Sequence, residues 1–201
     1  LGDVYKRQMV KPARCIFEYI YFARLDSKID NISVYEARIR GGATLAKTYP
    51  VDADLVCGVP DSGLASAKGY SEESGIPFGL AFHKNSYVGR TFIKPTQKER
   101  ESSVKIKLSV LESVVKGKRI VLVDDSIVRG TTISNLITML RKAGATEVHV
   151  RISSPPFLYP CYFGTDVPSN KQLIASSHST EEIRQQIGAD SLGYMPIEEL
   201  Q

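Results

Sequence analysis

An apolar run that ends in two adjacent carboxylates is the feature that most constrains this chain. The segment RIVLVDD (119–125) has the length and the β-branched content of a buried strand. The next stretch, TTISNLITMLRKAG (131–144), carries apolar residues at helical spacing, and EVHVRISS (147–154) is a second apolar run. A strand, a helix and a second strand in this order predict a parallel β–α–β unit with helices against the sheet.

The helix predicted over 131–144 has signals at both ends. Thr131 or Thr132 is suited to cap its start, and Gly144 is placed to end it in a left-handed conformation. A further strand and helix are predicted from DLVCGVP (54–60) and GLASAKGYSEESG (63–75). The expected fold is therefore α/β, a central parallel sheet flanked by helices.

Composition narrows the class of protein. With 201 residues and 42% hydrophobic content the chain can form one globular core, and it contains no apolar run of the roughly 20 residues that span a membrane. Three cysteines, without the apolar middle of an export signal at the start, favour a reducing compartment, by default the cytoplasm. Residues 1–10 read as a tail or a remnant outside the fold, and 11–201 as the domain.

The net charge of +4 is concentrated in KPTQKERESSVKIK (94–107), where acidic residues alternate with basic ones. A nucleic-acid surface is only weakly supported by such a mixed segment, and no nucleic-acid partner is expected. A phosphorylated small molecule explains the positive charge equally well.

The acidic pair Asp124 and Asp125 is a candidate site because ligands of parallel sheets gather beyond the carboxyl ends of the strands. The residues that follow, 126–132, lead into a helix whose unpaired first amides favour an anion. A phosphate there would be repelled by bare carboxylates unless these face sugar hydroxyls or a divalent cation. A sugar phosphate satisfies both demands.

A second loop, GVPDSG (58–63), also lies between a predicted strand and a predicted helix and offers a second anion cradle. Leu64 and Ala65 stand where a nucleoside triphosphate P-loop needs Lys and Ser or Thr, which disfavours that type of site. Two cradles, an acidic pair and a magnesium ion fit a sugar with phosphate at one end and pyrophosphate at the other. Phosphoribosyl pyrophosphate is such a molecule.

Plainer interpretations exist for each motif. Two aspartates at a strand end can be a solvated helix entry or a lone metal site, and GVPDSG (58–63) can be a turn with a helix cap. SYVGRTF (86–92) can be a surface hairpin instead of a ligand lid. Cys57 reads as a small buried hydrophobe and His149 as strand packing.

Several segments together carry a family resemblance. They are VLVDDSIVRGTT, GVPDSG, KNSYVGRTFIKPTQKERESSVKIKLS and RCIFEYIYFARLDSKID. From about Lys11 onward the chain resembles the phosphoribosyltransferase half of the glutamine amidophosphoribosyltransferases, with Ser86 and Leu25 as small departures. The resemblance implies a type I phosphoribosyltransferase fold with a flexible lid loop. It also implies formation of 5-phosphoribosylamine and pyrophosphate from phosphoribosyl pyrophosphate and ammonia, the first step of de novo purine biosynthesis.

The resemblance also assigns roles to residues. It implies that Asp124 and Asp125 hold the ribose hydroxyls and share Mg²⁺ with Ser62, which lies in a pyrophosphate loop. It implies a catalytic contribution from Asp124, Asp125 and the lid residues Lys84, Tyr87 and Arg90. The substrate-binding residues that it implies are Asp61, Ser62, Gly63, Asp124, Asp125, Ser126, Ile127, Val128, Arg129, Gly130, Thr131 and Thr132.

Other parts of the family pattern are expected to be missing here. The glutaminase domain, which delivers ammonia, would precede residue 11, so glutamine hydrolysis is not expected of this chain. Cys15 and Cys161 match two of four cysteine ligands of an iron–sulfur cluster in some members, and the other two would lie beyond Gln201, so a complete cluster is not expected. A homotetramer inhibited by purine nucleotides is also implied.

Two other hypotheses compete with an ammonia-using transferase domain. The chain could be a regulatory module that binds phosphoribosyl pyrophosphate without turnover, which a basic DNA-binding extension would favour. Alternatively, a fragment without its partner domain could fold incompletely because apolar surface is left uncovered.

Overall fold

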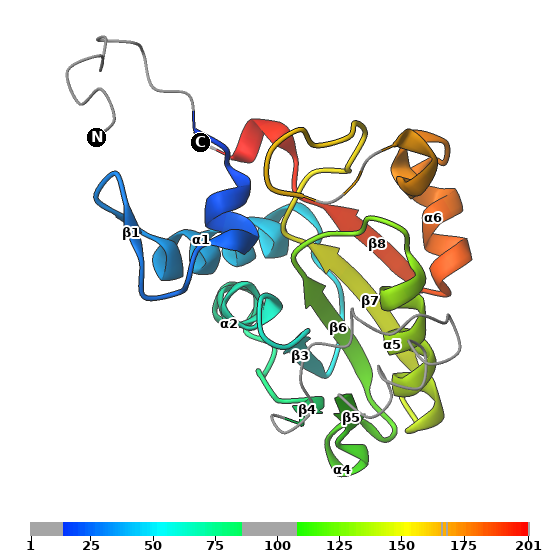
Figure 1. Cartoon of the computed structure of the whole chain (residues 1–201). Helices are drawn as coiled ribbons and strands as arrows, with labels where there is room; N and C mark the ends of the chain where they lie inside the picture. Colours follow the sequence, from blue (N-terminus) through cyan, green and yellow to red (C-terminus); the bar gives the residue numbers. More distant parts are fainter. Residues whose placement is uncertain (1–13, 86–107, 166, 168, 201) are drawn as a thin grey trace, which may run out of the picture.

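A four-stranded parallel sheet forms the centre of the protein (Figure 1). The computed structural model describes residues 14–85, 108–165, 167 and 169–200. The strands, in spatial order, are β3 (Leu55–Gly58), β6 (Arg119–Asp124), β7 (Glu147–Ile152) and β8 (Ser191–Tyr194). The three predicted strands are confirmed, and the one that ends in the acidic pair lies between two neighbours.

Helices cover both faces of this sheet (Figure 1). The covering helices are α1 (Val34–Thr48) and α2 (Gly63–Ser74) on one face, and α5 (Thr131–Lys142) and α6 (Thr180–Ile187) on the other. Val121 and Val123 of β6 pack in the α1–α2 core, whereas Ile120 and Leu122 pack in the α5–α6 core. A strand buried on both faces is apolar at every position, which explains the unbroken run in the sequence.

The start of α5 corrects one prediction. Gly130, not a threonine, occupies the N-cap position, in a left-handed conformation with φ of 78°, and Thr131 and Thr132 are already helical. A β-branched residue is disfavoured at positive φ, so the glycine takes the turn into the helix. At the other end Gly144 is left-handed with φ of 94°, as predicted.

The sequence analysis missed three of the larger elements: α1, α6 and β8. Ser33 caps α1 by accepting a hydrogen bond from the Glu36 amide at 3.3 Å, and α6 begins with a reciprocal capping box between Ser179 and Glu182. The smaller elements are the π-helical turn η2 (Glu18–Phe22), β1 (Lys28–Ile29), β2 (Ile32–Ser33), β4 (Phe82–Lys84), β5 (Leu108–Val110), α4 (Glu112–Val115), η4 (Asn170–Gln172), η5 (Ile174–Ser176) and η6 (Ile197–Glu199).

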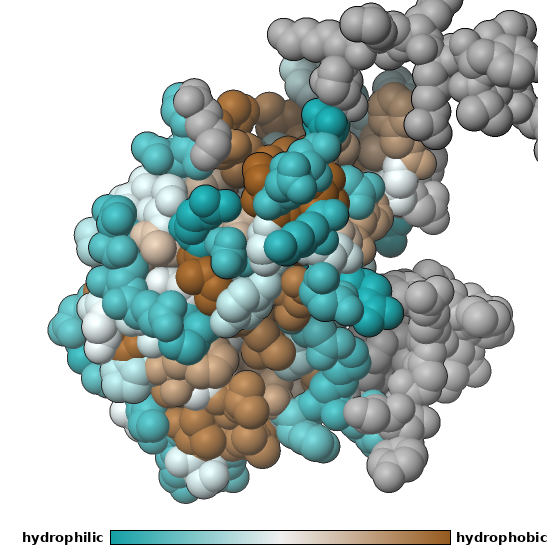
Figure 2. All heavy atoms as spheres, turned by 90° about the vertical axis from the view of Figure 1, so that its left-hand side faces the viewer, coloured by the Kyte–Doolittle hydropathy of each residue, from teal (hydrophilic) through white to brown (hydrophobic). Residues whose placement is uncertain are grey.

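Apolar side chains also reach the surface. Figure 2 shows one face on which apolar areas lie between hydrophilic residues. In the loop after β7, Tyr162 is 89% and Phe163 is 99% exposed. Exposed aromatic residues of this kind are typical of surfaces that another part of a protein covers.

The helices α1 and α2 approach until their backbones touch. A Cβ atom on Gly42 would lie 1.8 Å from the carbonyl oxygen of Ser66, and one on Gly69 would lie 1.9 Å from that of Ile39. Only glycine allows this approach, and it sets the position of the N-terminal end of α2, which follows the second predicted anion loop.

Gly42→Ala should therefore destabilise the fold by at least about 1–3 kcal/mol, because the added methyl group forces the two helices apart. Gly41→Ala is the matched control: its Cβ would meet the Met195 methyl group at an ordinary 3.7 Å. In a helix interior this second change should be neutral or stabilising by up to about 1 kcal/mol. Urea unfolding followed by circular dichroism measures both, and equal effects would contradict the packing argument.

Candidate functional site

The two predicted anion loops lie side by side at the carboxyl ends of β3 and β6. The Val59 amide donates to the carbonyl oxygen of Val123 at 2.9 Å, which continues the strand pairing one step further. A Cβ on Gly63 would come within 2.4 Å of the same carbonyl oxygen. The structure thus brings loop 58–63 against the start of loop 124–130.

The acidic pair is buried at this junction. Asp124 is the last residue of β6, and both aspartates are 8% exposed. The Asp125 amide donates to Asp124 Oδ1 at 2.9 Å, and the carbonyl oxygen of Asp124 accepts from the Ser153 amide at 2.9 Å. The carboxylate of Asp125 accepts hydrogen bonds from the hydroxyls of Ser62 and Ser126. Ser62 therefore connects the second loop directly to the acidic pair.

Burial raises the pKa of Asp124 well above its ordinary value, and the neighbouring charge of Asp125 raises it further. Burial also raises the pKa of Asp125, while the hydroxyls of Ser126 and Ser62 and the positive charge of Arg38 act in the opposite direction. Two buried carboxylates without a cation are costly. Hydroxyl donors or a hard divalent cation would offset this cost, and carboxylate and hydroxyl oxygens are donors that Mg²⁺ accepts.

Arg38 of α1 is a residue that the sequence analysis missed. Its side chain is buried, and it donates to three carbonyl oxygens around η2: Tyr19 at 2.8 Å, Tyr21 at 3.0 Å and Ala23 at 2.9 Å. Nothing in the local sequence distinguishes it from the exposed basic residues of the same helix. Arg38 thus holds the segment before β1 in place, and its positive charge also acts on Asp125.

The loop after the acidic pair is held in place by a buried side chain and by hydrogen bonds to the segment before α6. Ile127 is 3% exposed and packs in the α5–α6 core, so only its backbone could meet a ligand. The carbonyl oxygen of Val128 accepts from the Ile174 amide at 2.9 Å, and the Arg129 side chain donates to Gln172. Gly130 then turns the chain into α5, whose first amides are the unpaired donors of a helix start.

The second loop carries its own charged contact. Its Pro60–Asp61 peptide bond is cis, and the Asp61 carboxylate forms an ion pair with Lys84 Nζ at the end of β4. Lys84 is thus the predicted lid residue that the structure places beside this loop. Tyr87 and Arg90 lie outside the described residues.

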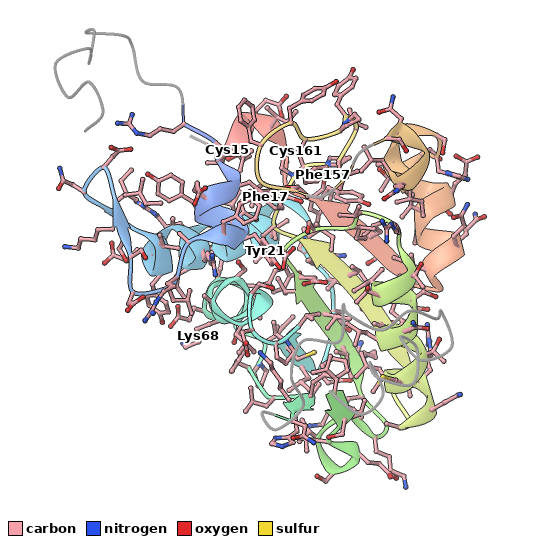
Figure 3. All side chains as sticks on the ribbon, viewed as in Figure 1. Cys15, Phe17, Tyr21, Lys68, Phe157 and Cys161 are labelled. Carbon is pink, nitrogen blue, oxygen red and sulfur yellow. The ribbon has the colours of Figure 1, made fainter. Side chains whose placement is uncertain are left out.

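The two cysteines assigned to a partial iron–sulfur ligand set come from the segment before η2 and the loop after β7 (Figure 3). The Phe17 and Phe157 rings pack 5.3 Å apart between these segments. Cys15 is exposed, and backbone amides of Thr165 and Phe163 lower the pKa of Cys161 to about 7. Among the described residues no three His, Cys, Asp or Glu side chains gather to hold a metal, so the ligand set stays a prediction.

Two other predictions are confirmed. Cys57 is completely buried in β3, and burial raises the pKa of its thiol to about 12. His149 lies on β7 with 7% exposure, and its Nδ1 is 3.0 Å from Ser191 Oγ.

None of the helices that the structure describes is long and apolar enough to cross a membrane.

Comparison with known proteins identifies a family for this chain. Residues 30–153 match the phosphoribosyl transferase domain. The chain belongs to the phosphoribosyl transferase domain family. It is similar to the phosphoribosyltransferase part of amidophosphoribosyltransferases, and its α/β architecture agrees with the fold expected of a type I member.

Curated relatives are close to this chain in sequence. The chain is 58% identical to the amidophosphoribosyltransferase of Methanocaldococcus jannaschii, over 94% of this chain and 40% of the relative. It is 58% identical to that of Bacillus subtilis, over 92% and 39%. A structure of glutamine phosphoribosylpyrophosphate amidotransferase from B. subtilis, complexed with ADP and GMP, superposes with a TM-score of 0.84 and covers 92% of this chain and 41% of that chain. The chain spans about two fifths of the length of the curated relatives it matches.

The buried acidic pair generates a stability prediction for this family member. Asp124→Asn keeps an oxygen that can accept from the Asp125 amide and removes one of two adjacent buried charges. Without divalent cations at pH 8, the variant should melt at a higher temperature than the wild type, by about 2–4 °C for each kcal/mol of repulsion relieved.

Asp26→Asn is the control for this experiment, because the ion pair of Asp26 with Arg24 is exposed and its loss relieves no repulsion. Differential scanning calorimetry measures all three proteins. Adding MgCl₂ should raise the melting temperature of the wild type more than that of Asp124→Asn. A variant that melts lower than the wild type in the absence of cations would contradict the repulsion argument.

Proposed function

We propose that this chain binds phosphoribosyl pyrophosphate with Mg²⁺ and transfers its phosphoribosyl group to ammonia, as the phosphoribosyltransferase part of an amidophosphoribosyltransferase. The observation that carries the proposal is the Ser62–Asp125 contact, because it unites two anion loops and the acidic pair in one place. The similarity to amidophosphoribosyltransferases supports the same function.

The proposed ligand divides naturally among the groups of the site. Ribose hydroxyls are donors, and the carboxylates of Asp124 and Asp125 are acceptors that lack enough donors of their own. The amides and hydroxyls of 126–132, at the start of α5, would hold the 5-phosphate. Loop 58–63 and Lys84 would hold the pyrophosphate, since the loop reaches the acidic pair through Ser62 and Lys84 pairs with Asp61 of the same loop.

The reaction that we propose is a displacement at the anomeric carbon. The nitrogen lone pair of ammonia forms the new bond while the bond to the pyrophosphate oxygen breaks, the leaving group takes that electron pair, and the nitrogen then loses one proton. The carboxylates stabilise the positive charge that develops on the sugar, and Lys84 faces the departing anion. Mg²⁺, held by Asp124, Asp125 and Ser62, would supply further neutralisation of the pyrophosphate charge. No side chain acts as a nucleophile.

Further partners belong to this proposal. The structure from B. subtilis is of a complex with ADP and GMP, and purine nucleotides carry the ribose and phosphate groups that these loops suit, so we propose that they compete for the site. Ammonia would come from a glutaminase domain, and the assembly would be a homotetramer. The three free thiols suit a reducing cytoplasm.

Calorimetric titration with phosphoribosyl pyrophosphate tests the binding step. We expect binding that requires Mg²⁺, with loss of at least about tenfold in affinity in Asp125→Asn, because a buried carboxylate that accepts charged or hydroxyl donors is removed. Glu72→Gln removes an exposed acid of α2 that pairs with Lys68 and should bind like the wild type.

Turnover is measured on the same proteins as pyrophosphate released in ammonium buffer. Magnesium-dependent release that Asp124→Asn abolishes is the expected result. Tight binding without release would favour the regulatory module, and absence of binding in a cooperatively folded wild type would rule the proposal out.

A further inference from the structure

The ion pair between Asp61 and Lys84 occupies the loop that the proposed function gives to pyrophosphate. It joins the loop after β3 to the end of β4, with side-chain exposures of 68% for Asp61 and 34% for Lys84. The next residue, Ser62, donates to Asp125. Two consecutive residues of this loop therefore contact the buried acid Asp125 and the more exposed base Lys84.

This ion pair is poorly placed to stabilise the fold. Exposed pairs contribute little because water solvates both charges well. A carboxylate is also an unfavourable neighbour for a bound anion, since it repels the anion and occupies the cation that the anion needs. Asp61 is therefore expected to weaken ligand binding and to change the free energy of unfolding little.

We propose that Asp61 is an internal competitor for Lys84 and thereby a specificity-determining residue of the pyrophosphate loop. The proposal rests on the proposed function. A ligand gains the charge of Lys84 only if it displaces Asp61. A diphosphate brings enough negative charge to do so, whereas a single phosphate competes poorly. Asp61 thus sets a minimum of negative charge that a ligand must bring to occupy this loop.

Asp61→Asn tests this inference, because the amide has the same shape and no charge. Calorimetric titrations in the presence of Mg²⁺ compare inorganic pyrophosphate, phosphoribosyl pyrophosphate and ribose 5-phosphate as probes. We expect Asp61→Asn to bind the first two roughly 5- to 10-fold more tightly, a size typical of one charge contact. Ribose 5-phosphate, which has no second phosphate for this loop, should change less than about twofold.

The double variant Asp61→Asn/Lys84→Gln separates competition of Asp61 for Lys84 from direct repulsion between Asp61 and the anion. If Asp61 acts by occupying Lys84, the gain from Asp61→Asn should fall to about twofold or less in a Lys84→Gln background. Asp61→Glu keeps the charge and should show less of the gain in pyrophosphate affinity than Asp61→Asn. Glu72→Gln, which removes one exposed acid from α2, controls for net charge. Thermal melts confirm that each variant is folded.

The outcomes are distinguishable. Weaker or unchanged pyrophosphate binding in Asp61→Asn, or an equal gain in the Lys84→Gln background, overturns the inference and leaves the proposed function standing. A wild type that binds neither phosphoribosyl pyrophosphate nor pyrophosphate overturns the proposed function and this inference together.

Discussion

The parallel pairing of β3 with β6 is the constraint on which the rest of the site depends. Its register ends with Gly58 opposite Val123, and one more backbone hydrogen bond, from the Val59 amide to the Val123 carbonyl oxygen, joins the two segments beyond the strand β3. The acidic pair follows on one strand and the second anion loop on the other. Because the two loops leave the sheet from adjacent strands, Ser62 lies within hydrogen-bonding distance of Asp125.

The site gains its chemistry at the expense of local stability. Two adjacent carboxylates, each 8% exposed, are held in place by a core that is complete on both sides of the sheet. Arg38 opposes their charge from α1, yet its hydrogen bonds go to the carbonyl oxygens around η2 and not to the carboxylates. The two carboxylates can therefore accept further hydrogen bonds or a cation. A ligand that carries hydroxyls and a bound metal ion would supply both.

The parts of the fold that were predictable are those in which local pattern and tertiary environment agree. β6 is apolar from Ile120 to Val123 because both its faces are buried, and α5 shows one clear apolar stripe. β8 was missed because SLGY is short and contains Gly193, against which the Tyr49 ring packs. The threonine cap was wrong because the turn into α5 needs positive φ. Arg38 and the Asp61–Lys84 pair depend on contacts between distant segments, which residue spacing does not encode.

An acidic pair and an anion cradle can share one place because the groups of the site are paired with one another. Asp125 already accepts from the Ser62 and Ser126 hydroxyls, and Lys84 is already paired with Asp61. In the proposed complex, a ligand that offers hydroxyls or a cation to Asp125 would free the two serine hydroxyls to donate to phosphate oxygens, and its own phosphates would replace Asp61 at Lys84. Binding is thus an exchange of partners, so its free energy is the difference between two sets of contacts. A ligand with only one kind of group would gain from half of that exchange, which is the physical reason for proposing a ligand that carries hydroxyls and more than one phosphate.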